Sequence, residues 1–157
     1  MSLDEQIANL IRIGALKQAA RDEALIRQYL ANAEELRADA DAPKSALSRF
    51  LLAYEALHAL AMAFLTDRGL RTDGEGHRSV ALQLAIRELT KDAKLGGAVQ
   101  AVIQIHKARN NTTYFQPIPP VSDRLAAATL KLVDAVLAGA KAQIQLSGTP
   151  SAPDKSI

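Results

Sequence analysis

Apolar residues recur along most of the chain at the spacing of one helix face. Positions i, i+3, i+4 and i+7 lie on the same side of an α-helix, so an apolar stripe at these positions predicts an amphipathic helix. The clearest stripe follows Pro43 and ends at Asp67-Arg68-Gly69, where Gly69 is typical of a left-handed helix end. Its members are Leu47, Phe50, Leu51, Tyr54, Leu57, His58, Ala61, Phe64 and Leu65.

Further helices are predicted on either side of this one. Ser2 and Glu5 have the spacing of a capping box, so a short helix begins there, and Gly14 interrupts it. A longer helix is predicted from Leu16 to Ala40, and residues 71–76 are predicted to form a loop. The next helix is predicted from His77 to Thr90, with Val80, Leu84 and Leu89 inward. Another is predicted from about Gly96, with one stripe formed by Val99, Val102, Ile103, His106 and Arg109. The last is predicted from Ser122 to Gln145, and its inward residues are Leu125, Thr129, Leu132, Val133, Val136, Ala140 and Ile144.

These elements predict an all-α fold, an antiparallel up-and-down bundle of four to five helices. We expect one helical domain over residues 1–145 and a disordered tail, rich in Ser, Pro and Gly, over residues 146–157. Composition agrees, because Ala and Leu make up about a third of the chain and aromatic residues only 4%. Ala and Leu are strong helix formers, whereas β-sandwiches and barrels use β-branched and aromatic residues.

Charge and cysteine content indicate which ligands and which cellular compartment suit the chain. The net charge is only +2, but residues 43–116 carry 10 basic and 6 acidic side chains, a local excess of +4 that suits a phosphate-binding surface or an ordinary solvated one. The chain has no Cys, which excludes disulfides and thiolate sites and fits a reducing compartment. No apolar run approaches the roughly 20 residues of a bilayer span, and the acidic N-terminus is unlike a signal peptide. We therefore expect a cytoplasmic protein without a membrane partner.

Several common catalytic motifs are absent from the sequence. There is no Walker phosphate loop and no His-Glu-x-x-His. Gly74-Glu75-Gly76 precedes a predicted helix but follows no predicted strand, so a dinucleotide-binding fold is unsupported. The carboxylates are scattered on polar faces, which argues against a di-metal bundle site. We expect neither a metal nor a cofactor.

One polar group stands out near the end of the helix that follows Gly96. His106 and Arg109 are three residues apart and share a helix face, and Asn110 and Tyr114 follow closely. Because Arg109 continues an apolar stripe, its guanidinium is directed toward the bundle or toward a partner. The residues alone favour a structural role, in which Arg109 bonds the last carbonyls of its helix or an acidic neighbour. A role in binding an anion is the alternative.

The stretch Ala108-Arg109-Asn110-Asn111-Thr112-Thr113-Tyr114 resembles the signature of HEPN domains (higher eukaryotes and prokaryotes nucleotide-binding). That signature is an Arg, often followed by Asn, and a His after four to six further residues. Many bacterial members carry a Tyr in place of the His. Upstream, the helix around Tyr54 resembles the family's apolar helix, and Gly76-His77-Arg78 resembles the loop and helix start that follow it. The resemblance spans roughly residues 20–140.

The resemblance implies a helical bundle that forms a homodimer, with the two Arg motifs facing each other, and RNA or a nucleotide as ligand. Arg109 and Asn110 would bind phosphate, with His77 and Tyr54 as further ligand-binding candidates. Active members of the family are metal-independent endoribonucleases, often toxins of prokaryotic toxin–antitoxin or defence systems, and others are non-catalytic binding modules. An antitoxin-type protein that modifies Tyr114 would be a second partner.

The residue at the motif's last position decides between binding and catalysis. RNA cleavage by its own 2′-hydroxyl needs a base with a pKa near neutrality and a cation for the phosphorane, roles that His and Arg fill. Here Tyr114 stands at the His position, and a phenol with a pKa of about 10 is a poor base. We therefore expect a non-catalytic or degenerate binding module.

Two alternatives to this reading stay open. The first is an active endoribonuclease toxin that uses Arg109 with Tyr114 or with the imidazole of His106. The second is a ligand-free structural bundle. His58 and Tyr54 each have a structural role as an alternative, whichever of these functions applies. His58 is expected to be a core or interface residue, and Tyr54 fits the core at least as well as a ligand site.

Overall fold

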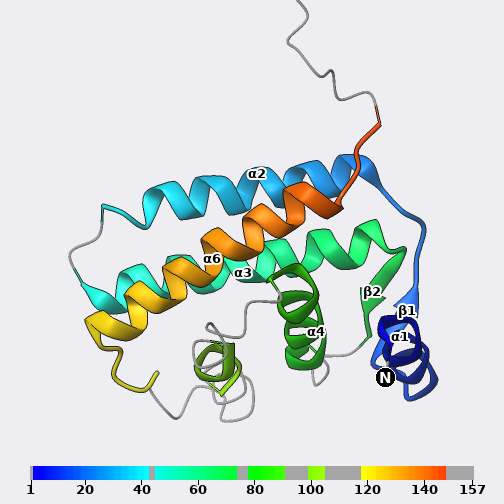
Figure 1. The fold of residues 1–157 in the computed structure, drawn as a ribbon, viewed down its shortest axis with the longest axis horizontal. Helices are drawn as coiled ribbons and strands as arrows, with labels where there is room; N and C mark the ends of the chain where they lie inside the picture. Colours follow the sequence, from blue (N-terminus) through cyan, green and yellow to red (C-terminus); the bar gives the residue numbers. More distant parts are fainter. Residues whose placement is uncertain (1, 43–44, 74–77, 91–98, 105–117, 148–157) are drawn as a thin grey trace, which may run out of the picture.

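The chain is predominantly helical, as the sequence predicts (Figure 1). The computed structural model describes residues 2–42, 45–73, 78–90, 99–104 and 118–147. Its elements are α1 (Leu3–Arg12), β1 (Leu16–Gln18), α2 (Glu23–Asp39), α3 (Ala46–Asp67), β2 (Leu70–Thr72), α4 (Arg78–Thr90) and α6 (Asp123–Gln143), with a further helical stretch over residues 99–104.

Helix α3 is the centre of the fold and contacts α2, α4 and α6. Half of its residues are buried, including Phe50, Leu57 and Phe64. The helix begins where the Ser45 hydroxyl accepts a hydrogen bond from the Ser48 amide at 3.1 Å. It ends before Gly69, whose φ of 69° is the left-handed conformation that the sequence predicts there.

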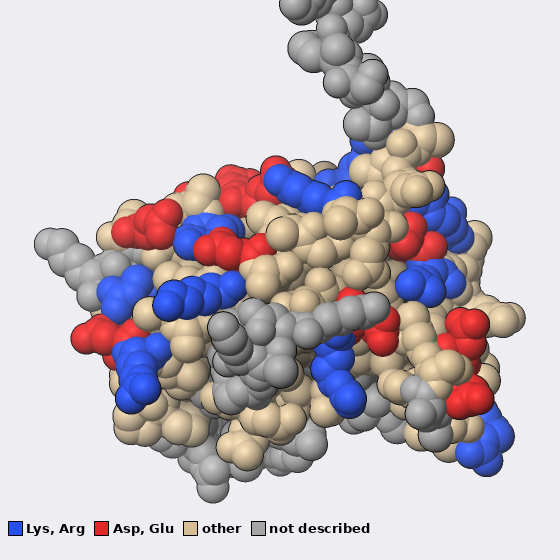
Figure 2. Space-filling view, in the orientation of Figure 1, with Lys and Arg blue, Asp and Glu red and all other residues tan. Residues whose placement is uncertain are grey.

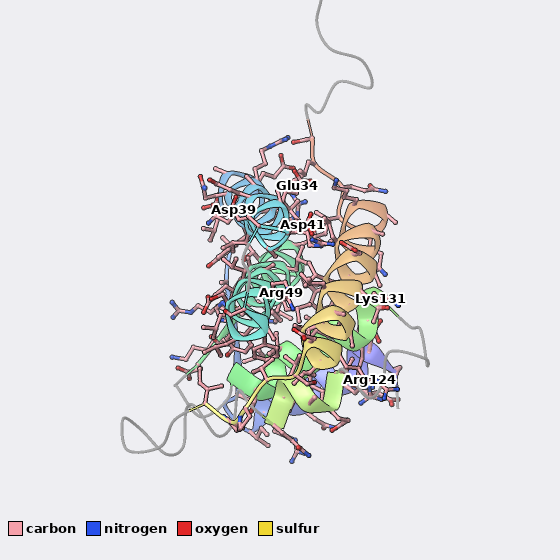
Figure 3. The ribbon with its side chains drawn as sticks, turned by 90° about the vertical axis from the view of Figure 1, so that its left-hand side faces the viewer. Glu34, Asp39, Asp41, Arg49, Arg124 and Lys131 are labelled. Carbon is pink, nitrogen blue, oxygen red and sulfur yellow. The ribbon has the colours of Figure 1, made fainter. Side chains whose placement is uncertain are left out.

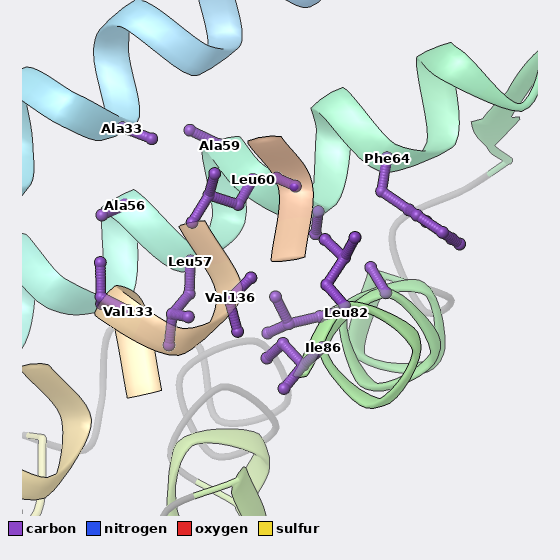
Figure 4. Close-up of a cluster of buried hydrophobic side chains, with 14 of the residues drawn as sticks. Ala33, Ala56, Leu57, Ala59, Leu60, Phe64, Leu82, Ile86, Val133 and Val136 are labelled. Atoms are coloured by element: carbon purple, nitrogen blue, oxygen red, sulfur yellow. The ribbon is translucent and has the colours of Figure 1, made fainter. Parts of the chain in front are cut away.

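The helices do not all lie along one axis. In Figure 1, α2, α3 and α6 run lengthwise beside one another, with α2 antiparallel to the other two, whereas α4 crosses them steeply. Figure 4 views α4 almost end-on where it meets α3 and α6. The mainly helical class is therefore confirmed, while the up-and-down arrangement of a HEPN bundle is not.

The first helix is confirmed in detail. The Glu5 amide donates to the Ser2 hydroxyl at 3.2 Å, and the Ser2 amide donates to the Glu5 carboxylate at 3.1 Å, which completes the predicted capping box. After α1, Gly14 takes a φ of 81°, and the chain reverses. The predicted interruption at Gly14 is confirmed.

The prediction of one continuous helix from Leu16 to Ala40 is wrong at its start. Residues 16–18 form β1, which pairs antiparallel with β2, a segment that the sequence predicts as loop. Helix α2 begins only at Glu23, because the carboxylate of Asp22 accepts from the Leu25 amide at 3.1 Å and caps the helix there. The pairing joins residues that are more than 50 positions apart, so periodicity within either segment does not reveal it.

The main core lies where α3, α4 and α6 meet (Figure 4). Leu57 and Leu60 from α3, Leu82 and Ile86 from α4, and Val136 from α6 are all fully buried. The inward stripe predicted for the last helix is largely confirmed. Its buried members are Thr129, Leu132, Val133, Val136, Ala140 and Ile144, and Ala126 joins them, while Leu125 is half-buried.

Candidate functional site

Of the six residues with which the sequence defines a site, all except Tyr54 lie outside the described part of the chain. These are His77, His106, Arg109, Asn110 and Tyr114. The structure does describe the chain on both sides of the Arg109 motif. The two flanks therefore show which elements lead into and out of it.

The chain enters the motif from a helix that is packed into the core. Residues 99–104 are helical, with Val99, Val102 and Ile103 buried and Gln100 and Gln104 exposed. This confirms the first half of the apolar stripe on which the sequence places Arg109. Because Val102 and Ile103 are nearly inaccessible, the helix is anchored six residues before the motif begins.

The chain leaves the motif toward the start of α6. Ile118 is half-buried, and the Ser122 hydroxyl accepts from the Leu125 amide at 3.0 Å to begin the helix. One turn of α6 is tied to α3 by an ion pair, in which Arg49 donates to Asp123 at 2.7 Å. The flank that leaves the motif is thus tied to the central helix α3, and the flank that enters it is buried in the hydrophobic core.

Two exposed cations lie on α6 beyond this flank. Arg124 and Lys131 are seven residues apart, which places them on one side of the helix two turns from each other (Figure 3). Within the described chain neither side chain contacts a carboxylate. On the face that Figure 2 shows, basic and acidic side chains are intermixed. Arg124 and Lys131 are therefore cations that an anionic ligand could use.

Of the predicted ligand residues, only Tyr54 is described. Its side chain is 7% exposed, and its ring stacks on Phe50 with ring centroids 6.4 Å apart. That environment supports the packing role that the sequence also allows, and a ligand contact stays a prediction. One turn further along α3, His58 is half-buried, as expected for a core or interface histidine.

One cluster of charged side chains joins three helix ends. The guanidinium of Arg21 donates to Asp67 at 2.9 Å and to Glu23 at 2.8 Å. Glu23 also accepts from the hydroxyl of Ser147 at 2.7 Å and from its amide at 3.0 Å. The hydrogen bonds from Ser147, followed by that from Arg21, lower the pKa of Glu23 from 4.5 to about 2. Both carboxylates of this cluster, Glu23 and Asp67, are paired. The cluster therefore holds three helix ends together and offers no free carboxylate for catalysis.

A second charged contact connects α2 and α6. Arg37 donates two hydrogen bonds to Asp134, at 2.7 and 3.2 Å, in a bidentate arrangement. Asp41 accepts a third at 3.0 Å, and hydrogen bonding of Arg37 to the Asp134 carboxylate is the main reason that the pKa of Arg37 is raised. Sequence reasoning does not find either cluster, because the pairing residues are up to 124 positions apart.

One groove is hollowed beside the N-terminal helix. It has a volume of about 650 Å³ and lies between α1, the end of β1 and the turn that joins α3 to β2. Ile7, Ile11 and Leu70 supply apolar walls, while Asp4 and Arg68 contribute opposite charges. The groove is separate in sequence from the Arg109 motif, and no motif in the sequence indicates it.

The described residues contain no group of three or more His, Asp or Glu side chains that could hold a metal ion. One described helix, Ala46–Asp67, is long and apolar enough to cross a membrane, with a mean hydropathy of 1.3. This qualifies the expectation from the sequence that no such segment exists. However, 61% of its apolar window is buried inside the protein, as in the core helix of a water-soluble fold.

Comparison with protein-family models, with curated proteins and with solved structures finds no match to this chain. Any functional conclusion therefore depends on the residues of the Arg109 motif and on the geometry of its flanks.

Proposed function

We propose that this chain is a HEPN-like helical module that binds RNA or a nucleotide through Arg109 and Asn110. The observation that carries the proposal is the order Arg-Asn-x-x-x-Tyr in the sequence, which begins five residues after a described helical stretch, 99–104, whose residues Val99, Val102 and Ile103 are buried. An arginine guanidinium can bind a phosphate through two parallel N–H donors.

The flank that leaves the motif supports an anionic ligand. Arg124 and Lys131 add two exposed cations along α6, within the segment that follows the motif. Phosphate binding gains from each additional cation because counterions are released from the nucleic acid. A strand bound at Arg109 that continued along α6 would meet both side chains.

Binding without rapid cleavage is the activity that these residues favour. Tyr114 stands where a base would be needed, and a phenol remains protonated near pH 7. Its ring can instead stack on a base or donate a hydrogen bond. The endoribonuclease alternative requires His106 or Tyr114 to take the proton from a 2′-hydroxyl.

The test measures the affinity of the full chain for short fluorescent single-stranded RNAs and for mononucleotides at two salt concentrations. Arg109→Ala should lose binding, and Arg124→Ala should weaken it by a few-fold and reduce its salt dependence. Lys141→Ala is the matched control. Lys141 is an exposed cation at the other end of α6, roughly 25 Å from Arg124, so its removal should change little.

Two outcomes would contradict the proposal. Equal affinity of the wild-type chain and Arg109→Ala would show that the motif does not hold the ligand. Absence of binding by the wild-type chain would favour the ligand-free bundle. Cleavage of RNA by the wild-type chain, lost in Arg109→Ala, would show the endoribonuclease instead.

A further inference from the structure

The groove beside α1 combines an apolar wall with a charge at its end. Asp4, Ile7 and Ile11 are spaced by three and four residues, so they lie on one side of the helix, and all three line the groove. Ile7 and Ile11 are half-buried and also pack against the core. Because a helix rises 1.5 Å per residue, the wall from Asp4 to Ile11 is about 10 Å long.

The opposite wall comes from the end of β1 and from the turn between α3 and β2. Leu70 contributes a buried apolar side chain to it. Arg68 is exposed and carries its guanidinium over the ring of Phe64, 5.3 Å from the ring centroid. Gln18 adds an exposed amide, which can both donate and accept a hydrogen bond. A ligand between the two walls would therefore meet apolar surface together with charges of both signs.

Neither charge of the groove has an ion-pair partner within the described chain. In this part of the chain, Asp4 and Arg68 are not paired with each other either, although they line one groove. The carboxylate next to Arg68, that of Asp67, is in contrast paired with Arg21 at 2.9 Å. A carboxylate and a guanidinium that are both available beside apolar walls are complementary to a ligand with one ammonium and one carboxylate.

We propose that the groove binds a short apolar peptide whose two ends are free and oppositely charged. Asp4 holds the ammonium end, and Arg68 holds the carboxylate end. The apolar side chains of the peptide pack on Ile7, Ile11 and Leu70. This site is independent of the proposed function, because it contains no residue of the proposed RNA-binding surface.

The dimensions of the groove favour a peptide over a single amino acid. An extended chain rises about 3.3 Å per residue, so three residues match the wall from Asp4 to Ile11. A free amino acid has the same two charges but is too short to contact both ends of that wall. The volume of about 650 Å³ lies within the range of ligand pockets, about 300–1,000 Å³.

Isothermal titration calorimetry of the full chain with trileucine tests the site. Three further probes each lack one feature of this peptide. They are N-acetyl-trileucine, which has no ammonium, trileucine amide, which has no carboxylate, and leucine, which has both charges but not the length. Loss of either charge should weaken binding by about fivefold, as expected for one partly exposed ion pair, and leucine should bind at least about tenfold more weakly. This comparison uses the unaltered protein, so it does not depend on the folding of a variant.

Two variants identify the partner of each charge. Asp4→Asn should weaken the binding of trileucine by about fivefold and leave that of N-acetyl-trileucine unchanged, because this probe has no ammonium to lose. Arg68→Gln should have the same effect on trileucine and none on trileucine amide. Glu35→Gln and Arg71→Gln are the matched controls, since both residues are exposed charges outside the groove. The controls should bind trileucine as the wild-type chain does.

Three results would overturn the proposal. The wild-type chain could fail to bind trileucine, whether the groove stays empty or takes a larger partner. It could bind the charged and the blocked probes equally. The Asp4 and Arg68 variants could also behave as the two controls do. None of these results bears on the binding of RNA through Arg109, which is measured with different ligands and variants.

Discussion

The carboxylate of Glu23 shows how one residue can join two segments that are far apart in the sequence. It accepts from Arg21 beside it and from Ser147, 124 positions later. The Ser147 carbonyl in turn accepts from Arg27 at 2.7 Å. These bonds fix the segment that follows α6 against the start of α2, and those that Glu23 accepts from Arg21 and Ser147 favour its ionised form.

This arrangement predicts a pH dependence. Because the pKa of Glu23 in the folded chain is about 2 and its ordinary value is 4.5, its contribution to stability is complete above pH 4.5. The contribution is lost as the pH falls from 4.5 toward 2. Ser147→Ala removes the largest cause of the shift, so the pKa of Glu23 should rise toward its ordinary value. Carbon-detected NMR titration of the carboxyl measures this directly.

The wild-type chain is the reference for that titration, and Gln145→Ala is its control. Arg21 donates to the backbone carbonyl of residue 145, which the substitution keeps. The midpoint for Glu23 should therefore stay low in the control. An equal midpoint in the wild-type chain and Ser147→Ala would show that the hydroxyl does not stabilise the carboxylate.

At the scale of elements, α4 and α6 approach each other closely at Gly139. A Cβ atom at Gly139 would lie 1.7 Å from the carbonyl oxygen of Leu89. Nearby, the side chain of Gln143 donates to the carbonyl of Glu88 at 3.1 Å, which gives the end of α4 a polar partner. Glycine at this position permits the steep crossing of the two helices (Figure 4).

We expect Gly139→Ala to destabilise the protein although Ala is the better helix former. The new methyl group cannot fit, so α4 and α6 must separate, at a cost of about 1–3 kcal/mol in the free energy of unfolding. Ala138→Gly is the control on the exposed neighbouring position, and its cost should be only the helix propensity difference of about 1 kcal/mol. Urea denaturation measures both, and a stabilised Gly139→Ala would contradict the packing described here.

The error over residues 16–22 also belongs to the element scale. Leu16 and Leu70 are buried in strands that pair with each other, but each strand has only three residues. Three residues are too few to show a period of two, so Leu16 is readily taken for the start of the helical pattern that follows. Asp22 is an N-cap residue type, and it was the local signal that could have moved the start of the helix to Glu23.

At the scale of the whole molecule, α3 connects all the other long helices. Leu57 is completely buried between α3 and α6, in the region where the α3 and α6 side chains interdigitate (Figure 4). A single core of this kind implies that α2, α3, α4 and α6 unfold together. Cooperative unfolding of these helices is what the prediction of one domain over residues 1–145 means in physical terms.

We expect Leu57→Ala to lower the free energy of unfolding by about 2–5 kcal/mol, because the cavity it leaves cannot collapse in a packed helix interface. Far-ultraviolet circular dichroism and tyrosine fluorescence should report one coincident transition. Leu47→Ala, at an exposed position of the same helix, should change stability by less than about 1 kcal/mol. Two separate transitions would show that the helices form more than one unit.

The sequence by itself determined the helical class, most helix limits and the inward face of α6. For α3 it determined the face only in part, because Leu47 of the predicted stripe is exposed and Leu60, outside that stripe, is buried. These depend on local rules, namely a repeat of 3.6 residues, capping by Ser2, Ser45 and Ser122, and a left-handed glycine at position 69. Only the tertiary structure decided the β1–β2 pairing, the steep crossing at Gly139 and the joining of Glu23 to Ser147. Such contacts join residues far apart in the chain, and they depend on the shape of the packed helices, which no local pattern contains.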